Sequence, residues 1–113
     1  MTVTRVATHP FLARYNLTVT VNTAAGCTVS GDLFPDTGGV SRRNLYRADS
    51  GQLYVVGQFD VRRFDDQRCT VELIEFRSLE SGLNFLGAFD TDREGHWTFL
   101  SVDERPERLF EKL

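Results

Sequence analysis

The chain has 113 residues, of which 41% are hydrophobic, and this length and composition predict a single domain spanning residues 1–113 with a core of its own. The formal net charge of −3 is uneven, with +2 in residues 1–56 and −5 in residues 57–113, and the acidic second half argues against nucleic-acid binding. The sequence holds no run of the roughly 20 apolar residues that a membrane-spanning helix needs, so no membrane association is expected.

The clearest periodicity lies near the N-terminus. In the segment RYNLTVTVN, residues 14–22, apolar side chains from Tyr15 to Val21 alternate with polar ones. The alternation resumes in CTVSGDLF, residues 27–34, after a short connection of small residues. Two alternating runs joined in this way predict an antiparallel hairpin with one buried face and one wet face.

Five further strands are expected along the rest of the chain. They follow loops or turns rich in Gly, Asp and Pro, and their approximate ranges are 44–48, 52–64, 69–77, 83–89 and 96–101. Gly57 interrupts the longest of them and indicates a bend or a bulge there. Because the connections are short, neighbouring strands should be antiparallel. The expected fold is mainly β: an antiparallel meander of six to seven strands, forming a small barrel or a sandwich.

The segment SVDERPERLFEKL, residues 101–113, is predicted to form a short C-terminal helix. Acidic residues would lie near its N-terminus, and Pro106 suits the first turn. Leu109, Phe110 and Leu113 would form an apolar edge. We therefore expect this helix to pack on the sheet.

Cys27 and Cys69 are the only cysteines, and neither belongs to a Cys-x-x-Cys pair. Each lies in an alternating apolar run, which favours two buried free thiols over a disulfide. The first residues, MTVTRVATHP, lack the basic and apolar segments of a secretory signal. These two observations together predict a reducing, cytoplasmic location.

The segment AFDTDREGHW, residues 88–97, resembles the beginning of a calcium-binding loop, because carboxylates alternate and a glycine follows. Counted from Asp90, however, the twelfth position is Ser101, which cannot supply the bidentate carboxylate that closes an EF-hand site. The residues also suit an acidic turn in which Gly95 adopts a positive φ. We favour the turn, and no metal or cofactor is predicted.

The sequence offers no recognisable catalytic group. His9 and His96 are the only histidines, and no serine or cysteine lies in a nucleophile motif. One basic cluster, Arg42, Arg43 and Arg47, could bind an anionic ligand through charge and hydrogen bonds. A loop of solvated cations is the interpretation that we favour for this cluster.

These features suggest a non-enzymatic module that binds another protein through that protein's basic surface. The size of the chain suits a small bacterial inhibitor or toxin-neutralising (immunity-type) protein. Its acidic loops would steer the partner. The predicted partner-binding residues are Asp65, Asp66, Asp90, Asp92 and Glu94. The alternative is a small β-barrel that binds or acts on a small molecule, in a pocket lined by the aromatic residues Tyr54, Phe59, Phe85 and Trp97. A self-assembling structural component is a third possibility.

Overall fold

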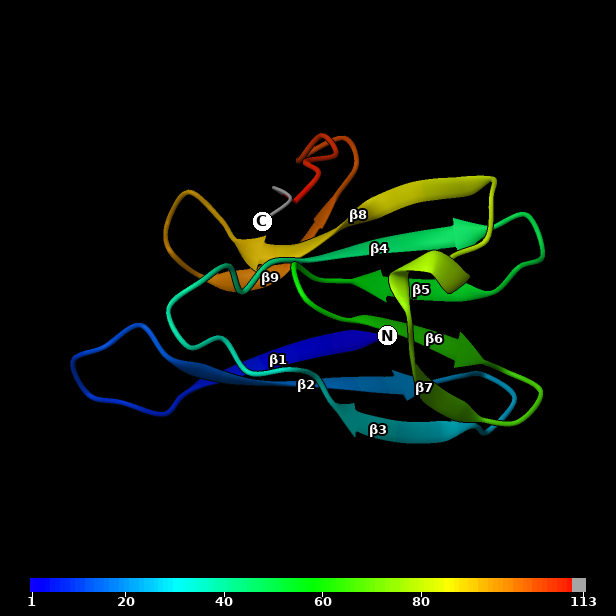
Figure 1. The fold of residues 1–113 in the computed structure, drawn as a ribbon, viewed down its shortest axis with the longest axis horizontal. Coiled ribbons are helices and arrows are strands. Elements are labelled where there is room, and N and C mark those ends of the chain that lie inside the picture. Colours follow the sequence, from blue (N-terminus) through cyan, green and yellow to red (C-terminus); the bar gives the residue numbers. More distant parts are fainter. Residues whose placement is uncertain (111–113) are drawn as a thin grey trace.

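The computed structural model describes residues 1–110, which form nine strands in two antiparallel sheets (Figure 1). The three-stranded sheet has the order β1-β2-β3, and the six-stranded sheet has the order β7-β6-β5-β4-β8-β9. The strands are β1 (Thr2–Ala7), β2 (Tyr15–Asn22), β3 (Thr28–Asp32), β4 (Arg43–Ala48), β5 (Leu53–Val56), β6 (Val61–Asp65), β7 (Thr70–Ile74), β8 (Leu83–Thr91) and β9 (Trp97–Ser101).

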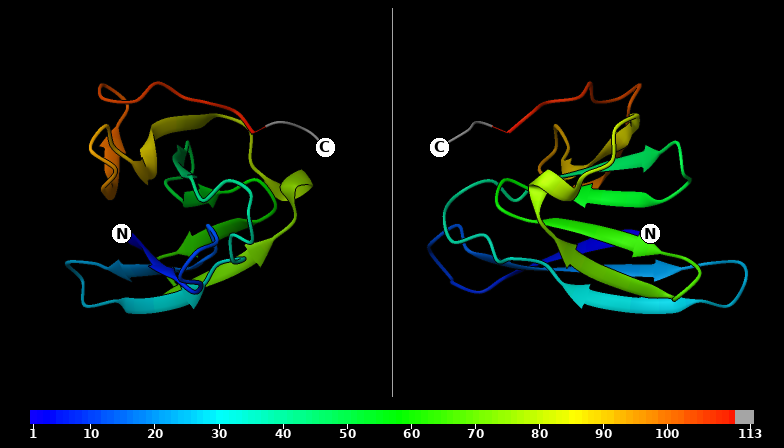
Figure 2. Two further views of the ribbon diagram at one scale, coloured as in Figure 1. Left: turned by 90° about the vertical axis from the view of Figure 1, so that its left-hand side faces the viewer. Right: turned by 45° about the vertical axis from the view of Figure 1, so that its right-hand side comes forward.

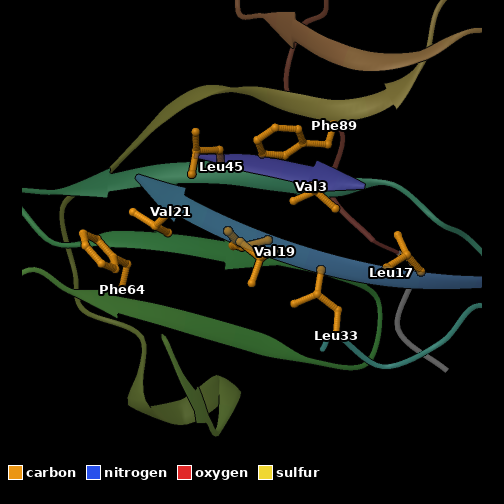
Figure 3. Packing of buried hydrophobic residues seen from close by; sticks show 9 residues of the cluster. Val3, Leu17, Val19, Val21, Leu33, Leu45, Phe64 and Phe89 are labelled. Atoms are coloured by element: carbon orange, nitrogen blue, oxygen red, sulfur yellow. The ribbon is translucent and has the colours of Figure 1, made fainter. Parts of the chain in front are cut away.

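The two sheets face each other and enclose the main core between them (Figure 2). Alternate residues of β2, among them Leu17, Val19 and Val21, are buried, which confirms the period-two hairpin predicted for this region. The complete buried cluster is Val3, Leu17, Val19, Val21, Leu33, Leu45, Val55, Phe64 and Phe89 (Figure 3). The sheets do not close into a barrel within residues 1–110. Of the two architectures expected, a barrel and a sandwich, the structure has the sandwich.

The structure has nine strands, two more than the upper figure of the six to seven expected. The segment 52–64 is two strands, because the chain reverses at 57–60 instead of only bending at Gly57. The other addition is β1, which has no clear alternation because only Val3 of its residues is buried in the core. Strand β1 forms because its backbone pairs with that of β2.

Cys27 and Cys69 form a disulfide across a sequence separation of 42 residues, so the prediction of two free thiols is wrong. The bond joins the β2–β3 turn to the β6–β7 turn and thus links the two sheets. Strands β3 and β7 also lie close together, since a Cβ on Gly31 would be 3.7 Å from the Val71 side chain. Both cysteines are half-buried, whereas the alternation around them predicted full burial, and that alternation could not distinguish a thiol from a disulfide.

The predicted C-terminal helix is absent from residues 101–110, and the only helical element in the described range is a 3₁₀ turn, η1 (Phe76–Ser78). After a turn at 101–105 the chain runs extended across the outer face of the six-stranded sheet. There the carbonyl oxygen of Arg108 accepts a hydrogen bond from Asn44 (2.9 Å). Phe110 packs against a second apolar cluster, which consists of Tyr46, Ala48, Tyr54, Val56 and Val61. Residues 111–113, the end of the expected helix, lie outside the described residues.

Tyr46 fastens this extended segment to the sheet, because its hydroxyl donates a 2.7 Å hydrogen bond to Glu107. Burial, together with this hydrogen bond, raises the pKa of Tyr46 from 10.0 to about 12. The neutral phenol therefore stabilises the folded state fully below pH 10, and this contribution disappears as the pH rises from 10 towards 12.

We expect the stability difference between the wild-type protein and Tyr46→Phe to depend on pH. The phenol stabilises the wild type at about pH 9, and much of that advantage should be lost by about pH 11, since the unfolded chain loses the proton first. Urea unfolding of both proteins at the two pH values would measure this difference in stability. A stability difference that does not change with pH would contradict the raised pKa of Tyr46.

Candidate functional site

The segment between β8 and β9 is an acidic turn, as favoured from the sequence. The Asp92 carboxylate accepts backbone hydrogen bonds from Glu94 and His96, each at 2.9 Å, and Gly95 has a φ of 83°. The hydrogen bond from the His96 backbone is the main cause that lowers the pKa of Asp92. Asp90 turns away to pair with Arg105, so the carboxylates of this turn do not converge on one point. Residues 1–110 hold no group of three His, Cys, Asp or Glu side chains placed to bind a metal.

The predicted partner-binding residues divide between the two ends of the sandwich. Asp65 ends β6 and Asp66 begins the β6–β7 turn, near the disulfide, where Asp65 accepts hydrogen bonds from the backbone of Gln67 and Arg68. Asp90 lies near the end of β8, and Asp92 and Glu94 lie in the β8–β9 turn, which emerges at the opposite end (Figure 1). The five residues therefore lie at two separate turns.

The three arginines of the predicted anion site also diverge. Arg42 and Arg43 are buried, so the expectation that they are solvated is wrong, and Arg47 alone is exposed. The Arg42 guanidinium lies 4.4 Å from the centre of the Phe110 ring on the outer face of the sheet. Arg43 points to the β5–β6 turn.

Arg43 belongs to a buried ionic cluster centred on Asp60, which is 2% exposed. Its Nη2 lies 3.3 Å from one oxygen of Asp60, and Arg62 lies 3.5 Å from the other. A buried carboxylate is tolerated only when it is paired in this manner. Sequence reasoning missed Asp60; the available signal was one acidic residue in the apolar stretch YVVGQFDV.

This cluster fixes the backbone of two loops, 33–42 and 57–60. The amide of Phe34 donates to Asp60 at 3.0 Å, and Nη2 of Arg43 donates to the carbonyl of Phe34 at 2.9 Å. The β5–β6 turn also requires a glycine, because a Cβ on Gly57 would lie 2.6 Å from Nε of Arg43. Asp60 of one loop and Arg43 of β4 thus hold the backbone of the other loop at Phe34.

A second set of hydrogen bonds shapes the loop 33–42 itself. The Asp36 carboxylate accepts bonds from the backbone of Gly38 and Gly39, at 3.0 and 2.7 Å, and from the Ser41 hydroxyl. Burial acts to raise the pKa of Asp36, but these hydrogen bonds outweigh it, and the pKa lies below its ordinary value. The loop is therefore ordered by internal contacts.

These fixed loops carry exposed apolar side chains. Phe34, Val40 and Phe59 are 43%, 40% and 58% exposed and surround a cavity of about 60 Å³. That volume accommodates water, whereas pockets for drug-sized ligands measure about 300–1,000 Å³. We call this surface, formed by loops 33–42 and 57–60, the loop end. The β8–β9 turn emerges from the same end of the six-stranded sheet (Figure 1).

The aromatic residues proposed for a small-molecule pocket lie in different places. Tyr54 and Phe85 belong to the second apolar cluster, on the outer face of the six-stranded sheet. Phe59 is at the loop end, and Trp97 is at the start of β9, where it packs against the main core. His9 accepts backbone hydrogen bonds from Phe11 and Leu12 and so has a structural role in its loop.

Two further observations complete the description. No helix in the described part of the chain is long and apolar enough to cross a membrane. Comparison with known proteins finds no family model, no curated protein and no solved structure that matches this chain.

Proposed function

We propose that this chain is a non-enzymatic protein-binding module that recognises its partner through the loop end. One observation carries the proposal: Phe34, Val40 and Phe59 are exposed on loops that a buried ionic cluster holds in one conformation. Exposed apolar groups that gather in one place mark interaction sites more often than scattered ones do.

The order of these loops favours binding. A partner that docks on a fixed loop does not have to order it, so less of the interaction free energy is lost. Aromatic side chains near the centre of an interface frequently dominate its affinity, and Phe59 is placed to act in this way. Loops carried by a rigid sheet are common sites of recognition for the same reasons.

The partner should combine an apolar contact with basic residues around it. Asp92 and Glu94 lie in the β8–β9 turn, which emerges from the six-stranded sheet beside the loop end. There they would attract a basic surface and speed association. Asp65 and Asp66, at the far end, are outside this surface. The inhibitor or toxin-neutralising role stays a prediction. The cytoplasmic location is not part of the proposal, because one of its two grounds, the expected free thiols, is contradicted by the disulfide.

A photo-crosslinking side chain tests the proposal directly. Replacing Phe59 with p-benzoylphenylalanine should crosslink the partner in cells that express the protein. The same replacement at Leu73, which is also exposed but lies on β7, should not. Once the partner is identified, Phe59→Ala should weaken binding by about 30-fold or more, with little change in stability, as measured by titration calorimetry and urea unfolding.

Charge reversal supplies the complementary measurement. Asp92→Lys together with Glu94→Lys should slow association and reduce its salt dependence, whereas Asp65→Lys with Asp66→Lys should not. Crosslinking from position 73 but not from position 59 would contradict the proposal. So would an affinity that Phe59→Ala leaves unchanged.

A further inference from the structure

The two sheets meet along two seams that differ in character. At one seam, β3 and β7 lie against each other and the disulfide joins their adjacent turns. At the other, the edge strands β1 and β9 leave an open groove of about 500 Å³ between them. We call this the seam groove. Its lining consists of Met1 with Thr2–Arg5 of β1, Phe89 of β8, and Trp97–Phe99 of β9.

Arg5 is the only charged side chain among the described residues that line the seam groove. Its guanidinium is held between two aromatic rings, with Cζ 4.0 Å from the centre of Tyr15 and 4.7 Å from that of Trp97. Within residues 1–110 this guanidinium makes no ion pair. The two rings contact the guanidinium carbon, and the N–H groups of Arg5, which have no carboxylate partner within residues 1–110, could bind one.

Both walls of the groove are sheet edges. Strands β1 and β9 end their sheets, and among the described residues neither has a strand partner on its outer side. The indole of Trp97 donates to the carbonyl of Val3 at 2.8 Å, which fixes the two edges relative to each other. An exposed edge of this kind is a template for another extended chain.

Strand β9 is the less protected of the two edges. Its sequence WTFLS contains no charged residue and no proline, the features that usually discourage edge pairing. Phe99 is 39% exposed beside the groove and offers an apolar contact to a chain added there.

The charge of Arg5 indicates which chain would bind. Pairing of two copies of this protein through these same edges is a poor fit, because the edge strands TVTRVA and WTFLS contain no carboxylate to pair with Arg5. We propose that the seam groove binds an extended peptide segment of a partner protein, which adds a strand to β9 and places an Asp or Glu side chain on Arg5. This site shares no lining residue with the loop end, and the proposal does not depend on it.

Selection of displayed random peptides on the wild-type protein provides the probe. The enriched peptides should alternate apolar and polar residues and contain a common acidic position. Their binding can be followed by the emission of Trp97, the only tryptophan of the chain, which lies in the groove. Arg5→Glu should weaken the best peptide by about 30-fold or more, and the peptide with Lys at its acidic position should bind this variant better than it binds the wild type.

Two further variants and a modified peptide make the result specific to the seam groove. Arg77→Glu, at an exposed arginine on η1, should leave the affinity within about twofold of the wild-type value, as expected for a distant surface charge. Arg5→Gln serves as a second variant if circular dichroism shows that Arg5→Glu does not fold. N-methylation of the peptide backbone on its pairing side should abolish binding.

Several results would overturn the proposal. These are the absence of enriched acidic peptides, an affinity that neither Arg5 variant changes, and unimpaired binding of the N-methylated peptide. A sizing column that shows a dimer, which Thr98→Pro dissociates, would assign the seam groove to a second copy of the chain instead.

Discussion

Asp60→Ala should lower the free energy of unfolding by about 3–5 kcal/mol, the usual effect of removing one partner from a buried ion pair. Asp60 and Arg43 are 2% and 4% exposed, so the mutation leaves a guanidinium buried without its carboxylate. The amide of Phe34 loses its acceptor as well. Urea unfolding measures this loss, and Asp66→Ala, at an exposed turn, should change stability by less than about 0.5 kcal/mol.

A double mutant separates the charge from the packing. Arg43→Met combined with Asp60→Ala should be less destabilised than the sum of the single mutants, because the buried guanidinium of Arg43 is no longer left without its carboxylate. Asp60→Asn retains an acceptor for Phe34 and should fall between Asp60→Ala and the wild type. Additive losses in the double mutant, or a loss of less than about 1 kcal/mol for Asp60→Ala, would show that the ionic cluster does not hold the loops.

Replacing Cys27 and Cys69 with alanine should lower the free energy of unfolding by about 4 kcal/mol. In the chain-entropy model the bond restricts the unfolded state, and its contribution grows with the length of the loop that it closes, here a separation of 42 residues. The effect should be concentrated on the contact between the sheets, because the bond joins a turn of one sheet to a turn of the other.

Urea unfolding with and without reductant distinguishes the disulfide from the packing of the two side chains. Reductant should destabilise the wild-type protein and leave the Cys27→Ala, Cys69→Ala double mutant unchanged. A wild-type midpoint that reductant does not move would contradict the bond. Since disulfides persist in oxidising compartments, the same result bears on where the protein works.

Features that depend on neighbouring residues were predictable from the sequence. Leu17, Val19 and Val21 alternate with polar residues, and a strand places such residues on one face whatever surrounds it. The turn that ends in Gly95 was predictable for the same reason, since its hydrogen bonds join residues at most four apart. Mainly antiparallel β structure followed from these local patterns together with the short connections.

Features that join distant parts of the chain were decided by the tertiary structure. The ends of the disulfide are 42 residues apart, and Asp60 meets the amide of Phe34, 26 residues away. No local pattern records such pairs. The interpretations of Cys27, Arg42 and Arg43 were wrong for this reason, because each side chain meets its partner only when the strands assemble.

The sequence by itself determined the class of fold, because the period of apolar residues selects strands and short connections select antiparallel pairing. Only the tertiary structure decided the rest: the two sheets in place of a barrel, the extended C-terminal segment in place of a helix, and the two candidate binding surfaces. The physical reason is that a buried polar group must find its partner wherever the fold provides one. Asn44 accordingly donates to the carbonyl of Arg108, 64 residues away, and this segment lies extended along the sheet.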